Sequence, residues 1–202
     1  MPNRNIFFDQ PLPVKTQYEP QKSSVNTSPG IIIPFSMGTS SDTSLTATAT
    51  GTPTSVVLIG SGKYYSSTLT LTDNTFTQPS NNLYSFIMPY DATLQNIYFS
   101  TVFYNDSNFF SNAVTTYTPF VALATATDSN TFTLITETIT PVNEPLLPNT
   151  QYIANTRLPG SQEELGLSIP AGTKVAILGG LTGSTTGTLF ISPVFNGGLW
   201  LT

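Results

Sequence analysis

Histidine and cysteine are both absent from the 202 residues of this chain. Without histidine, the sequence lacks the commonest general base and the commonest metal ligand, and a Ser/His/Asp triad is excluded. Without cysteine, it forms neither disulfides nor thiolate metal sites, and it has no thiol nucleophile. These absences exclude the commonest routes of hydrolysis and leave stability to packing alone.

Two-carboxylate chemistry, as in glycosidases, is the acid–base route that this composition leaves open. The adjacent Glu163 and Glu164 would point to opposite faces of a strand, and the other acidic residues stand singly in expected turns. Gly179, Gly180 and Gly183 follow an apolar run without the GxGxxG spacing or the helix of a phosphate-binding loop, so we interpret them as loop glycines. We therefore predict a non-enzyme with no catalytic residue, no metal site and no cofactor.

Charged side chains are also scarce, at 8% of the residues against about 25% in an ordinary soluble domain. Six basic and 11 acidic residues give a net charge of −5, and no Lys/Arg run is present, so we exclude nucleic acid as the main partner. No run of 18 apolar residues occurs, and the first ten residues, MPNRNIFFDQ, show no secretion signal. We therefore expect neither a membrane partner nor Sec export.

Threonine is abundant instead, at about one residue in six. Its β-branched side chain suits a pleated sheet and keeps a hydroxyl group for water, which favours an all-β chain. From residue 31 to residue 202, short segments recur between turn residues, as in one sandwich or barrel domain. The sequence predicts about ten strands near residues 45–50, 55–60, 65–72, 83–88, 93–104, 113–125, 131–139, 150–157, 173–179 and 186–195, and turns at 89–91, 128–130, 170–172 and 196–197.

Residues 1–30 differ from the rest of the chain. They hold five prolines and three of the six basic residues, and they show no alternating pattern. Proline fixes φ and removes backbone donors, so this segment is predicted to be an extended N-terminal arm, with a disordered tail as the other interpretation. We predict that the arm docks on a neighbouring subunit through its apolar residues, which are Ile6, Phe7, Phe8, Leu12 and Val14.

Aromatic residues are more numerous than one small core needs: 13 Phe, nine Tyr and one Trp. Tyr64 and Tyr65 are adjacent, as are Phe109 and Phe110, so one member of each pair must leave the core if it lies in a strand. Because charge is so scarce, we interpret the outward aromatics as an apolar contact between subunits, with loop covers as the alternative.

Several motifs in order resemble one known family. IIIPFSMGT begins at Ile31, and FIMPYDATL begins at Phe86 and leads into the IYFS that ends at Ser100. Later segments, from Phe120 to Thr133 and the LSIPAGT that begins at Leu167, are similar too. Residues 31–202 thus resemble the C-terminal domain of the collagen-like exosporium glycoproteins of spore-forming bacteria (the BclA/BclB type). Ala92 stands where the family usually has Gly, and the collagen-like stalk is replaced by the arm.

The resemblance implies a jelly roll like that of tumour-necrosis-factor and complement-type domains, assembled as a homotrimer on the spore surface. Our first hypothesis is a structural subunit of a spore-surface fibre or exosporium layer, with trimers linked by their arms and other spore-surface proteins as further partners. The alternative is a terminal adhesin or receptor-binding domain that its arm anchors to a fibre of another protein. Its ligand contacts would come from aromatics such as Tyr104, Phe109, Phe110 and Trp200.

Overall fold

The structure is a computed structural model that describes residues 30–38, 45–47, 53–62, 68–79, 84–103, 109–110, 116–153, 155–184, 187–189 and 193–202. All regular secondary structure assigned in these ranges is β-strand, so the predicted all-β class is confirmed. The described strands are β1 (Ile31–Ser36), β2 (Leu45–Ala47), β3 (Ser55–Ile59), β4 (Leu69–Thr70), β5 (Thr75–Thr77), β6 (Ser85–Ile87), β7 (Ala92–Phe103), β8 (Phe109–Phe110), β9 (Tyr117–Ala126), β10 (Thr131–Pro141), β11 (Gln151–Tyr152), β12 (Arg157–Gln162), β13 (Leu167–Ile169), β14 (Lys174–Gly183), β15 (Gly187–Leu189) and β16 (Pro193–Leu201).

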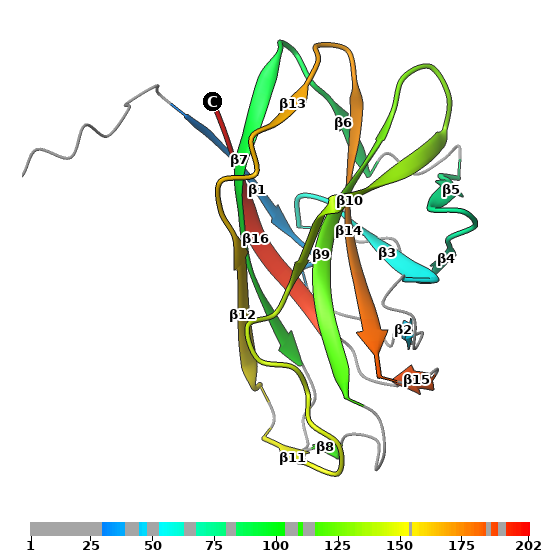
Figure 1. The fold of residues 1–202 in the computed structure, drawn as a ribbon, viewed down its shortest axis with the longest axis vertical. Helices are drawn as coiled ribbons and strands as arrows, with labels where there is room; N and C mark the ends of the chain where they lie inside the picture. Colours follow the sequence, from blue (N-terminus) through cyan, green and yellow to red (C-terminus); the bar gives the residue numbers. More distant parts are fainter. Residues whose placement is uncertain are drawn as a thin grey trace, which may run out of the picture.

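Most of these strands form two facing sheets (Figure 1). The first sheet runs β1-β16-β7-β12, and β13 pairs with β7. The second runs β4-β3-β14-β9-β10-β5, and β6 pairs with β14. Because β16 lies beside β7 and β14 beside β9, strands distant in sequence are neighbours and the chain crosses repeatedly between the layers. The structure is therefore a jelly-roll-like sandwich, as predicted.

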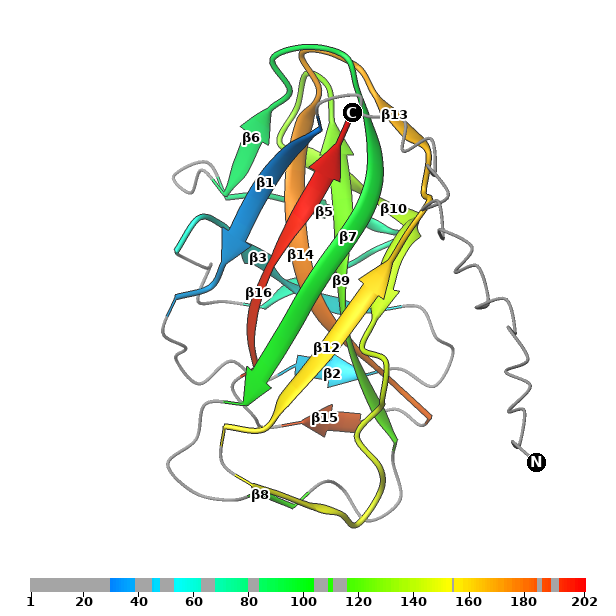
Figure 2. The same cartoon turned by 90° about the vertical axis from the view of Figure 1, so that its left-hand side faces the viewer.

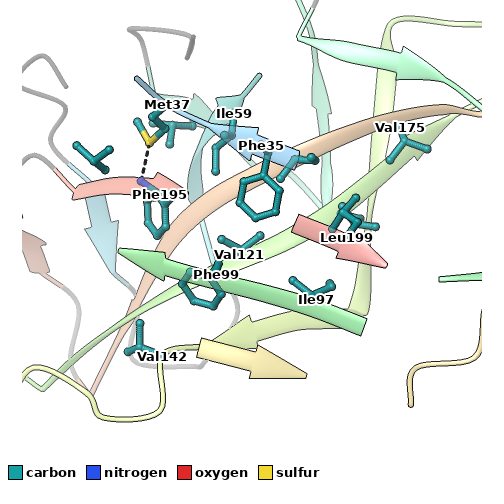
Figure 3. Packing of buried hydrophobic residues seen from close by; sticks show 14 of the residues in the cluster. Phe35, Met37, Ile59, Ile97, Phe99, Val121, Val142, Val175, Phe195 and Leu199 are labelled. Atoms are coloured by element: carbon teal, nitrogen blue, oxygen red, sulfur yellow. Dashed lines mark hydrogen bonds between the residues drawn. The ribbon is translucent and has the colours of Figure 1, made fainter. Parts of the chain in front are cut away.

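The main core fills the space between the two sheets (Figure 3). Phe35, Phe99 and Phe195 of the first sheet point toward Val121 of the second, and the rings of Phe99 and Phe195 lie 6.3 Å apart. The backbone N–H of Phe195 also donates to the sulfur of Met37 at 3.4 Å. These aromatic side chains therefore hold the first sheet against the second.

The second sheet carries another apolar cluster on its outer face. Val56, Phe120 and Leu178 belong to this cluster, and the segment that contains β4 and β5 covers them with Leu71 and Phe76. The strands β3, β9 and β14 are thus buried on both faces, which explains why they read as nearly continuous apolar runs. The alternation predicted for residues 65–72 holds in its described part, where Leu71 is buried between exposed Thr70 and Thr72.

The two long sides of the sandwich differ. On one side β10 reaches β12, where Asn143 N–H donates to the Pro159 carbonyl at 2.8 Å and Gln162 Nε2 to the Glu137 carbonyl at 3.0 Å. On the other side Ser36 of β1 pairs with the segment that follows β3: its N–H donates to the Gly60 carbonyl at 2.9 Å, and its carbonyl accepts from the Gly62 N–H at 2.9 Å. Beyond this contact, β1 and β6 border an open groove.

Two sequence predictions about glycine are wrong. Gly179, Gly180 and Gly183 lie within β14 and not in a loop, and Gly197 lies within β16 and not in a turn at 196–197. A Cβ atom on Gly197 would stand 2.2 Å from the Tyr98 carbonyl oxygen, so this glycine permits a close approach of two strands. The predicted turns at 89–91, 128–130 and 170–172 are present.

Candidate functional site

The predicted arm residues Ile6, Phe7, Phe8, Leu12 and Val14 lie outside the described residues, and so does Tyr104. Their docking role stays a prediction. Phe109 and Phe110 form β8, which pairs with β11 away from both main sheets. Of the aromatics named for a ligand contact, Trp200 is the one whose surroundings the structure describes.

Trp200 lies on the outer face of the first sheet, which Figure 2 shows from the front. No described element covers this face, and three large side chains stand exposed on it: Ile32 of β1 at 69%, Tyr98 of β7 at 44% and Trp200 at 37%. The sequences of β1, β16 and β7 contain no charged residue. The part of the face that these three strands form is therefore uncharged, with exposed Arg157 of β12 and the Glu163 carboxylate at its rim. An apolar patch of this kind is typical of the centre of a protein contact. We call it the outer face below.

Strand register brings these side chains together. Ile32 pairs with Trp200, while Gly198 pairs with Pro34 on one side and with Tyr98 on the other. Because Gly198 has no side chain, Pro34 and Tyr98 flank a position that carries only backbone. The outer face thus places Ile32 and Trp200 beside a position without a side chain, over which a Cβ atom would stand 3.1 Å from Ile32 Cγ2.

Trp200 also fixes how the chain enters β1. A Cβ atom on Gly30 would stand 1.7 Å from the indole nitrogen of Trp200, so the ring packs directly on the Gly30 backbone. A side chain at residue 30 would push the indole ring off its position. The arm therefore meets the folded domain at the edge of the outer face.

Polar contacts hold Tyr98 in place. Its hydroxyl accepts from Asn96 Nδ2 at 2.9 Å and donates to Glu163 Oε1 at 3.0 Å, while Asn96 Oδ1 accepts from the Glu164 N–H at 3.2 Å. Partial removal of this hydroxyl from water and its hydrogen bond to Glu163 raise the pKa of Tyr98 above its ordinary value. At neutral pH the ring is therefore anchored as a neutral donor at the rim of the outer face.

A second concave surface lies at one end of the sandwich, between the turn that joins β9 to β10 and the end of β13. It has a volume of about 550 Å³, and hydroxyl side chains such as Thr131, Thr133 and Ser168 line it together with Asp128. Its described lining contains no aromatic residue on which a sugar ring would stack. This surface gives the adhesin hypothesis little support.

The described residues offer little for other chemistry. They contain no group of three Asp or Glu side chains close enough to hold a metal ion together. None of the described segments is a helix long and apolar enough to cross a membrane. The adjacent acids Glu163 and Glu164 meet Tyr98 and Asn96, and their contacts orient the rim of the outer face.

Comparisons with protein-family models, with curated proteins and with solved structures find no match to this chain. The sequence predicts a contact role for Trp200 but not for Ile32 or Tyr98. Their signal was the lack of charge in β1, β7 and β16, which only the strand order of the fold brings onto one surface.

Proposed function

We propose that this protein is a structural subunit that assembles with copies of itself. In this proposal the outer faces of three copies meet in a homotrimer, and N-terminal arms link trimers into a fibre or layer on a spore surface. The single observation that carries self-association is the exposed, uncharged sheet face around Ile32, Tyr98 and Trp200. A chain with only 8% charged residues has few means of keeping such a face in water.

Two further parts of the proposal rest on the resemblance of the segments from Ile31 and from Phe86 to exosporium glycoproteins. These parts are the number of copies, three, and the location on the spore surface. The anchoring of Tyr98 by Asn96 and Glu163 supports a preformed contact surface, because a fixed ring loses little conformational freedom when it is covered. An apolar contact among identical copies needs no ligand, no cofactor and no metal.

Electron microscopy of the purified full-length protein tests the proposal. Fibres or sheets of regular repeat, formed by this protein alone, are the expected result. Discrete particles of one trimer, even at high concentration, would favour the alternative in which the arm anchors a terminal adhesin to another protein. Monomers would contradict both forms of the proposal.

A further inference from the structure

The edges of β1 and β6 lie on the same side of the sandwich (Figure 2). A groove lies between these two edges. Its volume is about 400 Å³, and its described lining is uncharged and mainly apolar. Ile33 and Phe35 form one wall, Ser85 and Phe86 the other, and Ile59 and Ser61 lie at one end. A groove of this composition suits apolar side chains of an extended segment.

The backbone of β1 faces this groove with hydrogen-bonding groups that have no partner among the described residues. Ser36 directs its N–H and carbonyl away from β16, to Gly60 and Gly62, whereas Met37 donates to Phe195 of β16. Because these directions alternate along a strand, the N–H and carbonyl of Ile32 and the carbonyl of Pro34 also point away from β16. An N–H at residue 34 would point away from β16, so the proline at this position removes no hydrogen bond between β1 and β16. The edge thus offers one donor and two acceptors to an added strand.

The N-terminal arm contains a segment that matches this edge. Residues 6–10, IFFDQ, are free of proline and carry one charge, at Asp9. In an extended segment Ile6 and Phe8 point to one face, and Phe7 and Asp9 to the other. With Ile6 and Phe8 in the apolar groove, Asp9 stays in water and Phe7 lies beside Ile32 on the outer face.

The intervening chain is long enough to reach another copy. Residues 11–29 span about 60 Å when extended, which exceeds the diameter of about 40 Å expected for a domain of this size. Pro11, Pro13, Pro20 and Pro29 favour an extended path over a tight return to the same domain. These lengths allow the arm to leave its own domain and pair elsewhere.

We propose that residues 6–10 of one copy add as a strand to the free edge of β1 in a second copy, with Ile6 and Phe8 in the groove. The inference rests on the proposed function and names the surface that receives the arm. Each copy gives one arm and receives one, so the contact is head to tail, and between trimers such a contact builds a chain that does not close.

The absence of native cysteine permits a direct test by disulfide trapping. Full-length protein with Phe8→Cys is mixed with full-length protein with Ser85→Cys under mild oxidation. Ser85 lines the groove and is only partly buried, so it tolerates the small change. We expect a disulfide-linked pair of twice the chain mass of 21.7 kDa on a non-reducing gel. Asp9→Cys is the matched control and should give no such pair with Ser85→Cys, because residue 9 points away from the groove.

Equal cross-linking by Phe8→Cys and Asp9→Cys, or none by either, would overturn the inference. A double variant, Phe8→Cys/Ser85→Cys, gives a further check. If it forms a disulfide within one chain while the mixture of single variants gives no linked pair, the arm fills the groove of its own domain and the inference is overturned. Light scattering on the protein without introduced cysteines separates the two proposals. If it shows trimers while the cysteine variants give no linked pair, only the proposed arm site is refuted. If it shows monomers, the proposed function is refuted.

Discussion

Glycines inside β14 leave room for aromatic rings on both faces of the second sheet. A Cβ atom on Gly179 would stand 2.7 Å from the Phe195 ring in the main core, and one on Gly180 would stand 2.1 Å from the Phe120 ring on the other face. Both rings are buried. The two glycines of β14 therefore serve opposite sides of one sheet, and each makes room for one phenylalanine.

Gly180→Ala is expected to lower the free energy of unfolding by about 1–3 kcal/mol, the usual cost of forcing extra volume into a tight core. The loss is measured by urea denaturation. Adding Phe120→Leu to Gly180→Ala should recover part of it, since the smaller side chain relieves the clash. A Gly180→Ala protein as stable as the unchanged protein would show that the ring moves aside freely.

Tyr98 gives the stability a dependence on alkaline pH. Its pKa is raised in the folded protein, so the folded state holds this proton more tightly than the unfolded state. The contribution of the neutral hydroxyl is complete below the ordinary tyrosine pKa of about 10 and is lost as the pH rises above it. We expect the free energy of unfolding to fall as the pH rises above about 10, and to fall less in Tyr98→Phe. Parallel urea titrations of the two proteins check this, and identical slopes would contradict it.

Among the elements, β10 contains an irregularity in its pairing with β9 that one side chain stabilises. Its pairing with β9 shifts between Ile135 and Thr140, and Thr138 bridges the gap. The buried Thr138 hydroxyl accepts from the Leu123 N–H at 2.8 Å and donates to the Ile135 carbonyl at 2.7 Å. The side chain thus replaces a ladder hydrogen bond while the strand bends toward β12.

Thr138→Val keeps the shape of the side chain and removes its hydroxyl, which leaves the buried Leu123 N–H without this acceptor. We expect a loss of about 1–3 kcal/mol in the free energy of unfolding. Thr138→Ser keeps the hydroxyl and should lose less. Chemical denaturation of both variants measures the difference, and a Val variant more stable than the Ser variant would contradict this role of the hydroxyl.

The segment with β5 closes the outer cluster of the second sheet. Phe76 of β5 stacks on Phe132 of β10, with ring centroids 5.4 Å apart and planes inclined by 10°. Phe76→Ala should cost about 3–5 kcal/mol of unfolding free energy, because it opens a cavity over the sheet. Thr77→Ala, an exposed neighbour, should change it by less than about 0.5 kcal/mol. Similar small losses in both variants would mean that β5 is not needed to cover the cluster.

Strands with a clear hydrophobic pattern could be predicted from the sequence. Strands whose formation depends on contacts with distant residues could not. The strands near 113–125 and 131–139 and the turn at 128–130 correspond to β9, β10 and their connection. By contrast β12, RLPGSQ, was missed because its Pro and Gly resemble a loop. Gly160 of this strand lies under the Phe99 ring, a contact that no local pattern reveals.

At the scale of the whole molecule, β1 joins the two surfaces that the proposals use. Ile32 stands on the outer face, while Ile33 and Phe35 line the groove. Neither surface could be predicted from the sequence, because β1, β16 and β7 come together only through the crossed strand order. The arm residues could be marked as apolar anchors, but the sequence alone gave no acceptor for them.

The central claim is that the outer face holds copies together, and the mass of the full-length protein in solution tests it most directly. Light scattering should give about 65 kDa, three times the chain mass of 21.7 kDa, or multiples of it. Ile32→Glu should weaken the contact between outer faces by more than about a hundredfold and lower the measured mass, because it buries an unpaired charge in that contact. Ile153→Glu is the matched control, since Ile153 is 72% exposed but lies away from this face, and it should leave the mass unchanged. A monomeric unchanged protein, or a full-sized assembly of Ile32→Glu, would contradict the account.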